Sequence, residues 1–381
     1  MTVSQRQQRR NILKAMGVGA LAFSAGACAP LAPRPPQYPR AFSRKPWAAP
    51  RISMDSVIRS IVGHRPYRPS GFNVSRETFD EKTVVHNYGH GGGGISLSWG
   101  SSALAVRETL GMKPGEVAVI GSGVMGLTSA RLLQDAGWQV TIYTRNVARH
   151  TTSNVAAGEW SPFSVHNPDV SSAAFKAQLN WAARIAHHAY TNLGGPDYGI
   201  RWLETYTPSN SPDADDGREE FADLFSYKRV LGPGEHPFPT PYARTFVTMQ
   251  IDPAVLLRRL IQDFQISGGK FIIRDFKDRA DVLSVPESVI FNCTGLGAAV
   301  LFEDTEVVPA KGQLVYIPPD PAIDYMTLGA GEDKGMLYMF PRSDVIVLGG
   351  TFKLGDYSTQ PEQAETERIV NGHQAFFSGF G

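Results

Sequence analysis

Short apolar runs and amphipathic stretches follow one another in the middle of the chain. Residues 117–120 form a short apolar run, and residues 140–143 form a second run rich in β-branched and aromatic side chains. Both are typical of strands buried in a parallel sheet. Between them, residues 127–137 carry apolar positions at helical spacing, and Gly137 ends that pattern. The three segments predict a β-α-β unit, the first half of a dinucleotide-binding fold.

Hydrophobic periodicity predicts further elements on either side of this unit. Residues 95–110 and 253–267 have the apolar spacing of helices, whereas residues 271–273 and 288–291 have the composition of strands. Residues 194–241 are rich in Gly, Pro and Asp, which predicts loops and edge structure. The alternation of strands and helices predicts an α/β fold with a doubly wound domain.

A glycine fingerprint, Gly121-x-Gly123-x-x-Gly126, lies between the first strand and the helix. In this position it predicts a phosphate-binding helix amino end. An acidic residue that binds the ribose is expected about 20 residues further on, and Arg145 stands there instead. Because an arginine can bind a 2′-phosphate, the fingerprint by itself leaves NADP as an alternative cofactor. The cofactor-binding residues predicted from it are Gly121, Gly123, Val124, Met125 and Gly126.

The first 50 residues have the pattern of an export signal and a linker. Residues 9–14 form a twin-arginine sequence, and a short apolar run over residues 15–27 follows. Small residues near position 28 offer cleavage sites, so residues 1–28 are predicted to be a signal peptide read by the twin-arginine export machinery. Cys28 offers the alternative of a lipid-anchored periplasmic protein. Residues 29–50 are dense in Pro and basic residues, which predicts an extended tether.

Composition narrows the remaining choices. The net charge of +1 and the scattered signs predict no basic face, which argues against a nucleic-acid partner. About 330 residues remain after the tether, enough for two domains. Cys28 and Cys293 are the chain's two cysteines, so cleavage after Cys28 would leave no intrachain disulfide. His86 and His90 have ligand spacing only on a helix, and the glycines around them argue against one, so no metal site is predicted.

Four separated segments, which together cover most of the chain after residue 51, resemble the D-amino acid oxidase family of FAD enzymes. They are residues 63–69 with the block HNYGHGGGGISLSWG (86–100); the fingerprint with TTSNVAAG (151–158); NCTG (292–295); and YMFP (338–341) running into LGGTF (348–352). In the family the first of these follows the other three, near the end of the chain. The resemblance therefore implies a circular permutation. The alternative is a domain-swapped homodimer, in which the leading segment completes the site of a neighbouring chain.

The resemblance implies an FAD-binding Rossmann-like domain made of residues 51–163 and 247–306. It also implies an α+β substrate domain with a mixed sheet, made of residues 164–246 and 307–381. FAD carries no 2′-phosphate, so the resemblance argues against NADP and leaves the adenosine contact of Arg145 open. The further FAD-binding residues that it implies are Gly91, Gly93, Gly94, Ile95, Ser96, Thr151, Thr152, Ser153, Ala157, Gly158, Thr294 and Gly295.

The activity implied by the family is oxidation of a D-amino acid to an imino acid, with hydride transfer from Cα to flavin N5. Oxygen then reoxidises the flavin to give hydrogen peroxide, and water hydrolyses the imine. Arg65 matches the residue that clamps the substrate carboxylate in the family. A guanidinium suits this role, since its forked N–H groups can bind both oxygens of a carboxylate. Tyr338 matches a tyrosine that also reaches the carboxylate, and the carbonyl of Gly92 would receive the amine. The alternatives are a surface ion pair for Arg65 and core packing for Tyr338.

Other functions remain open at this point. One is a dehydrogenase that uses another electron acceptor, or that takes glycine or an N-methyl amino acid. Another is a flavin-binding envelope protein without activity. The predicted pocket wall consists of Glu159, Ser161 and Phe340. It departs from the family at Glu159, where vertebrate members carry an apolar residue. We hypothesise that Glu159 favours substrates with a cationic side chain; the alternative is a carboxylate that faces solvent or pairs with a nearby arginine.

Overall fold

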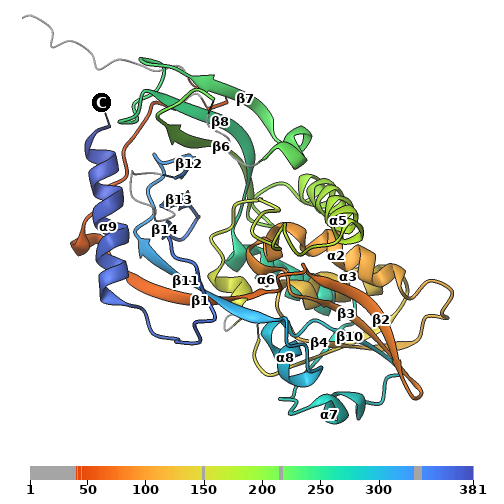
Figure 1. The fold of residues 1–381 in the computed structure, drawn as a ribbon. Helices are drawn as coiled ribbons and strands as arrows, with labels where there is room; N and C mark the ends of the chain where they lie inside the picture. Colours follow the sequence, from red (N-terminus) through yellow and green to blue (C-terminus); the bar gives the residue numbers. More distant parts are fainter. Residues whose placement is uncertain are drawn as a thin grey trace, which may run out of the picture. The chain divides into compact units, whose positions relative to one another are not determined.

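Two β-sheets organise the folded part of the chain (Figure 1). The computed structural model describes residues 40, 42–43, 45–147, 151–213, 218–329 and 337–380. The predicted signal peptide, including Cys28, lies outside these residues. None of the described helices is long and apolar enough to cross a membrane.

The six-stranded sheet has the predicted β-α-β unit at its centre. It consists, in order, of β2 (Asn73–Phe79), β3 (Lys82–Tyr88), β10 (Val289–Asn292), β4 (Glu116–Ile120), β5 (Gln139–Thr144) and β9 (Lys270–Ile273). All neighbours are parallel except β2 and β3. Alternate residues of β4 face opposite sides, so Val117 and Val119 pack in one apolar cluster and Ala118 and Ile120 in another.

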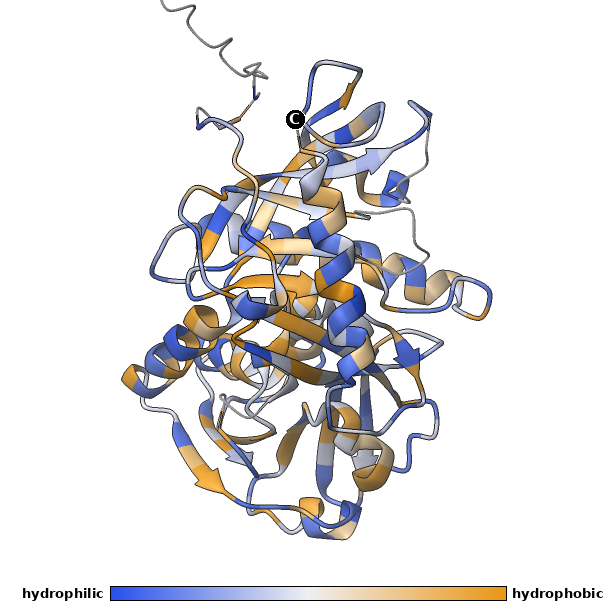
Figure 2. Cartoon of the chain, turned by 90° about the vertical axis from the view of Figure 1, so that its left-hand side faces the viewer, coloured by the Kyte–Doolittle hydropathy of each residue, from blue (hydrophilic) through white to orange (hydrophobic). Residues whose placement is uncertain are grey.

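Helices cover both faces of this sheet. The first face packs against α2 (Gly94–Arg107), α3 (Val124–Asp135), α5 (Ala173–Asn192) and α6 (Pro253–Ile266). The other face packs against the shorter α7 (Arg279–Leu283) and α8 (Ala298–Leu301). Figure 2 shows apolar residues gathered on the strands at the centre, whereas the helices at the surface carry both polar and apolar positions. This is the doubly wound α/β arrangement that the sequence predicts.

The nine-stranded sheet is mixed. Its strands run in the order β1 (Arg59–Tyr67), β11 (Val308–Ile317), β14 (Ile346–Gly349), β13 (Tyr338–Pro341), β12 (Tyr325–Leu328), β6 (Ile200–Ser209), β8 (Tyr242–Ile251) and β7 (Ser226–Leu231), and β15 (Lys353–Leu354) pairs with β11. The helix α9 (Gln363–Ser378) packs on this sheet (Figure 1). The prediction of loops and edge structure for residues 194–241 is wrong at β6, an internal strand between β12 and β8. Its side chains find partners far along the chain, which local composition does not reveal.

The segment that precedes β4 contributes to both sheets of its own chain. Strand β1 pairs with β11 from Arg59 opposite Tyr316 to Tyr67 opposite Val308, and β3 lies parallel to β10. The structure thus places β1 in the larger sheet, although the sequence assigns residues 51–163 to the cofactor domain. It also places β8, residues 242–251, in the larger sheet, across the predicted boundary at residue 247.

The folded body begins about ten residues earlier than residue 51. The Arg40 side chain is buried and pairs with Glu204, at 2.9 Å, and with Asp324. The Trp47 ring lies 5.2 Å from the Tyr325 ring and 6.1 Å from the Phe380 ring, which follows α9. The C-terminal end of the predicted tether therefore packs against the larger sheet.

Candidate active site

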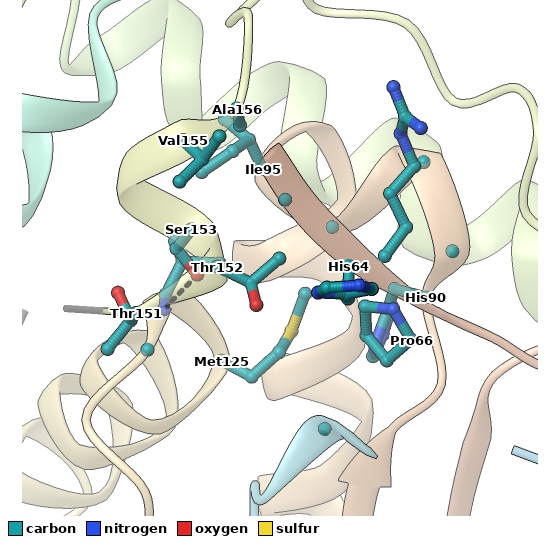
Figure 3. Close-up of a pocket in the computed structure, with 18 of the residues that line it drawn as sticks. His64, Pro66, His90, Ile95, Met125, Thr151, Thr152, Ser153, Val155 and Ala156 are labelled. Atoms are coloured by element: carbon teal, nitrogen blue, oxygen red, sulfur yellow. Dashed lines mark hydrogen bonds between the residues drawn. The ribbon is translucent and has the colours of Figure 1, made fainter. Parts of the chain in front are cut away.

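A cavity of about 1040 Å³ is lined by residues of both sheets. This volume lies at the upper end of the range of about 300–1,000 Å³ that is usual for ligand and cofactor sites. All the predicted site residues line it except Gly93 and Gly126. Figure 3 shows Thr151, Thr152 and Ser153 on one side of this space and His64, Pro66 and His90 on the other.

The fingerprint glycines let the chain turn tightly between β4 and α3. Gly121 has φ +108°, and a Cβ there would lie 2.6 Å from the carbonyl oxygen of Cys293. A Cβ on Gly126 would lie 1.9 Å from the Gly121 oxygen, so Gly126 allows close packing and does not line the cavity. The Val124 amide at the start of α3 donates to the Ser153 hydroxyl at 3.0 Å. The helix amino end and Ser153 thus lie together, as a pyrophosphate site requires.

The carboxyl ends of β5, β9 and β10 complete this part of the cavity. Arg145, directly after β5, is exposed, and its Nη1 atom lies 3.9 Å from an oxygen of Asp275 beyond β9. The Thr294 hydroxyl donates to the Asn292 side chain at 2.7 Å, and Gly295 has φ +59°. Ligands in doubly wound folds bind at this edge. Asp275 therefore lies at the cofactor-binding edge of the sheet because it follows strand β9. It was not predicted as a site residue from the sequence.

The glycine block forms a tight start to α2. Gly91 to Gly93 form a 3₁₀ turn, η2 (Gly91–Gly93), and Gly94 begins the helix. A Cβ on Gly91 would lie 2.6 Å from the Ser164 oxygen, and one on Gly93 would lie 2.6 Å from a Val165 methyl group. A Cβ on Gly92 would lie 3.1 Å from the Ser164 Cβ. Contact with residues 163–165 is therefore a further reason for these glycines.

Ser96 holds the first turn of α2 to the pocket wall. Its hydroxyl donates to the Glu159 carbonyl at 3.3 Å and accepts from the Ser161 amide at 2.8 Å. The Trp160 indole donates to the Ser96 carbonyl at 3.1 Å. Ser96 is predicted to bind FAD, and it lines the cavity. In the structure its hydroxyl also holds the segment that carries the pocket side chains.

His90 is a cavity residue that the sequence analysis considered only as a metal ligand. Its ring is 2% exposed and stacks on the Phe72 ring, with centroids 4.6 Å apart. Neither ring nitrogen has a hydrogen-bond partner among the described residues. Burial lowers the pKa of His90 to about 3, so the ring is neutral at pH 7. A buried polar atom of this kind needs a partner, and a cofactor in the cavity can provide one.

Arg65 reaches the cavity from β1 across a glycine of the neighbouring strand. A Cβ on Gly312 of β11 would lie 2.2 Å from the Arg65 Nη1 atom, so only a glycine leaves this path open. The Nη1 atom donates to the Thr351 carbonyl at 3.2 Å, and the guanidinium carbon lies 5.9 Å from the centre of the Phe352 ring. These contacts hold the guanidinium at the cavity wall.

Tyr338 of β13 lies beside Arg65. Its ring stacks on Phe340 with centroids 4.8 Å apart, and a Cβ on Gly349 would lie 2.1 Å from the ring. Burial raises the pKa of Tyr338; the charge of Arg65 lowers it and that of Glu159 raises it. The hydroxyl is therefore neutral at pH 7.

Glu159 and Arg218 are a pair of oppositely charged side chains that also line the cavity. The Glu159 side chain is 8% exposed and that of Arg218 is 13% exposed, with 3.9 Å between Oε1 and Nη2. Burial raises the pKa of Glu159 to about 7, and the charge of Arg218 opposes this shift. Arg218 precedes η4 (Glu219–Leu224) and was not singled out from the sequence. The structure thus supports the alternative in which Glu159 pairs with a nearby arginine. The hypothesis that Glu159 favours a cationic substrate side chain treated its carboxylate as unpaired.

Comparison with known proteins agrees with this architecture. Residues 116–381 match the model of a family described as DAO, FAD dependent oxidoreductase. The chain is 32% identical to a D-amino-acid oxidase of Streptomyces coelicolor over 263 residues, 68% of this chain and 76% of that protein. It is 29% identical to a D-amino acid oxidase of Dugesia ryukyuensis over 275 residues, 69% of this chain and 78% of that protein. A glycine oxidase structure from Bacillus cereus has a TM-score of 0.51 at 15% identity, over 69% of this chain and 77% of that chain.

The chain therefore belongs to the DAO family of FAD-dependent oxidoreductases. It is an enzyme with the predicted α/β fold, and FAD is its cofactor. The cavity fits this cofactor, since the glycine turn, the α3 amino end and the unpartnered His90 ring all lie along it. The family model begins at β4 and does not include the segment that carries Arg65 and the glycine block.

Proposed function

We propose that this enzyme oxidises D-amino acids, with oxygen as the electron acceptor. The observation that carries the proposal is the position of Arg65 and Tyr338, which lie together in the cavity that the glycine block also lines. A guanidinium beside a neutral phenol is suited to an α-carboxylate, since both groups can donate hydrogen bonds to it. The D-amino acid oxidases among its relatives support the same substrate class.

The residues divide the work of binding and orientation. Arg65 and Tyr338 hold the carboxylate, and the Gly92 carbonyl accepts a hydrogen bond from the amine. Bound FAD would supply the two-electron oxidising chemistry of the reaction. The amino end of α2 stabilises negative charge in this part of the cavity. The amino acid loses a hydride and a proton to give an imino acid, water hydrolyses this to an oxo acid and ammonia, and oxygen gains two electrons and two protons to give peroxide.

Peroxide formation by the purified holoenzyme tests this proposal. With D- and L-alanine, glycine and N-methylglycine offered in turn, we expect peroxide and pyruvate from D-alanine only. Reduction of an artificial acceptor without oxygen uptake would identify a dehydrogenase instead. Turnover of glycine or N-methylglycine in preference to D-alanine would reject the substrate class. A holoenzyme that oxidises none of these compounds would support the alternative function, a flavin-binding protein without catalytic activity.

We also propose that the chain is a circular permutant of its family. The family model begins at residue 116, whereas the segment that resembles the family's last motif precedes it. The Trp47 and Phe380 rings are 6.1 Å apart, so the end of α9 lies beside the stretch that leads into β1. A variant that runs from residue 112 to 380, through a Gly/Ser linker, and then from 40 to 111 should fold and bind FAD. Insoluble protein without FAD would contradict the permutation.

Export is a separate proposal that rests on the amino-terminal sequence. We propose that the twin-arginine route carries the folded, FAD-loaded protein to the periplasm. Replacing Arg9 and Arg10 by lysine should retain the protein in the cytoplasm of a host with this machinery. Replacing Cys28 by serine should release it from the membrane fraction if the cysteine is lipidated. Unchanged periplasmic export of the Arg9→Lys, Arg10→Lys variant would reject the route.

A further inference from the structure

We propose that Lys311 and the ion pairs around it are positioning residues for the substrate carboxylate. They hold residues 349–352 against Arg65 and Tyr338, and in this way they set the affinity of the cavity for a carboxylate. The inference rests on the proposed function, in which Arg65 and Tyr338 bind that group.

Residues 349–352 contact both of the proposed carboxylate-binding side chains. The Arg65 Nη1 atom donates to the Thr351 carbonyl at 3.2 Å. A Cβ on Gly350 would lie 2.8 Å from the Tyr338 hydroxyl, so the backbone of this glycine lies directly against the phenol. A displacement of residues 349–352 would therefore move the guanidinium and the hydroxyl together.

Lys311 lies on the face of the larger sheet that α9 covers (Figure 1). It precedes Gly312, the residue across which Arg65 reaches the cavity, and successive residues of a strand face opposite sides. The Lys311 side chain is 1% exposed and is not among those that line the cavity. Its effect on a bound carboxylate must therefore pass through other residues.

The buried ammonium group of Lys311 holds the chain that follows residues 349–352. Its Nζ atom donates to the Glu362 carboxylate at 2.8 Å and to the Ser358 hydroxyl at 2.6 Å, and it lies 3.2 Å from an oxygen of Asp356. Removing one partner of a buried ion pair leaves an uncompensated charge, so these contacts resist separation. Lys311 thus fixes the far end of the segment that begins at residue 349.

Further ion pairs extend the network back to the start of this segment. The Lys353 Nζ atom lies 2.8 Å from Glu362 Oε2 and 3.2 Å from Glu365 Oε1. The Arg368 Nε atom lies 2.7 Å from Glu365 Oε2, and its Nη2 atom donates to the Gly350 carbonyl at 2.9 Å. Charges of alternating sign therefore connect the buried lysine to a carbonyl that adjoins the site.

The neighbouring Gln313 holds both ends of the same segment. Its backbone amide donates to the Thr351 hydroxyl at 2.8 Å. Its side chain donates to the Glu362 carbonyl at 2.9 Å and accepts from the Glu362 amide at 2.7 Å. The position of the Thr351 carbonyl, which accepts from Arg65, thus depends on contacts made on the α9 side of β11.

Binding of propionate tests this role separately from catalysis. Propionate has the carbon skeleton of alanine without the amine, so it is not oxidised, and its dissociation constant follows from the flavin absorption of the holoenzyme. Lys311→Met should raise this constant about tenfold at unchanged flavin content, a change typical of residues coupled through one network. The KM for D-alanine should rise with it, while kcat changes less than twofold. Unchanged propionate binding in a soluble, flavin-loaded Lys311→Met variant would overturn the inference.

A double variant distinguishes positioning from general stability. In the Arg65→Met background there is no guanidinium to position, so Lys311→Met should weaken propionate binding only about twofold. Equal factors in both backgrounds would show that Lys311 acts independently of Arg65 and would overturn the inference. Lys82→Met is the matched control: it removes a lysine that donates to the Val285 and Glu287 carbonyls beside the smaller sheet. It should leave propionate binding unchanged, and a loss equal to that of Lys311→Met would assign the effect to destabilisation.

Arg368→Met gives a second test if Lys311→Met does not fold. The Arg368 side chain is 33% exposed, so the variant should remain soluble, and loss of its bond to the Gly350 carbonyl should weaken propionate binding about threefold. Unchanged binding in this variant would overturn the inference.

The same measurements separate this inference from the proposed function. If the Lys311 or Arg368 variant weakens propionate binding as expected but no amino acid is oxidised, the inference stands and the proposed function falls. If D-alanine is oxidised and Arg65→Met weakens propionate binding, whereas neither network variant does, the inference alone falls. If Arg65→Met leaves propionate binding unchanged, the carboxylate site itself is wrong, and both fall.

Discussion

The cofactor end of the cavity is formed mainly by backbone, whereas the substrate end is formed mainly by side chains. The cofactor end is formed by backbone at the carboxyl ends of parallel strands, with glycines where a Cβ would collide. The substrate end is formed by side chains that come from β1, from β13 and from the residue before η4. Backbone sites depend on local geometry, whereas side-chain sites depend on how distant segments meet. The two ends should therefore respond differently to substitution.

The largest effect is expected from Gly126→Ala at the cofactor end. The new Cβ would lie 1.9 Å from the Gly121 carbonyl oxygen, so the turn and the start of α3 must separate. Changes of this kind in a packed backbone destabilise by several kcal/mol, about 2–4 kcal/mol here. The ratio of bound flavin to protein, from visible absorption, should fall close to zero. The control is Gly115→Ala, whose Cβ would meet nothing within 4 Å; a normal flavin content in both variants would contradict the account.

At the substrate end, Arg65→Met should leave the fold and the flavin content intact. It removes the charged partner of the substrate carboxylate, and hydrogen bonds to charged groups contribute about 1.5–3 kcal/mol. The value of kcat/KM for D-alanine should fall about 100-fold. Arg59→Met, an exposed arginine of the same strand, should change it less than twofold. Comparable losses in both variants would mean that Arg65 acts through β1 and not on the substrate.

Gly312→Ala should perturb the same end more mildly. The added Cβ would lie 2.2 Å from the Arg65 Nη1 atom, but that atom is the far end of a flexible side chain. We therefore expect little loss of stability and a displaced guanidinium, with KM for D-alanine raised about tenfold, or about 1.4 kcal/mol. Equilibrium unfolding and steady-state kinetics check the two halves of this prediction. A strongly destabilised variant would show that Gly312 serves packing alone.

These contrasts explain which parts of the protein can be predicted from its sequence. The fingerprint, the strands β4 and β5 and the helix α3 have local patterns, so their positions follow from periodicity and glycine spacing. Arg65 and Tyr338 lie in recognisable motifs. Arg218 has no motif and joins Glu159 only because η4 and the strand β8 fold against each other. Internal strand β6 was missed for the same reason, since its partners β8 and β12 lie elsewhere in the chain.

The pH dependence of substrate choice is a further difference between the ends. Burial raises the pKa of Glu159 from 4.5 to about 7, so the group is neutral below pH 7 and charged above it. Protonation of Glu159 as the pH falls through 7 therefore removes one negative charge from the pocket. The ratio of kcat/KM for D-glutamate to that for D-glutamine should rise several-fold from pH 8 to pH 6. In Glu159→Gln the ratio should be high and independent of pH; a pH-dependent ratio there would assign the titration to another group.

Ser96→Ala should have the smallest effect. It removes the hydroxyl that donates to the Glu159 carbonyl and accepts from the Ser161 amide. Loss of such a bond costs about 1 kcal/mol. The value of kcat/KM for D-alanine should fall two- to fivefold, while the flavin spectrum is unchanged. A shifted flavin spectrum or a lower reduction potential would restore the predicted contact between Ser96 and the flavin.

Anaerobic titration of the purified holoenzyme tests the central claim most directly. The visible flavin band is followed while D-alanine and then L-alanine are added, and oxygen is readmitted at the end. The account predicts full bleaching by the D-isomer, no bleaching by the L-isomer and return of the band with oxygen. Flavin that D-alanine does not bleach would leave the fold and the cofactor in place and contradict the assignment of the Arg65 end as a D-amino acid site.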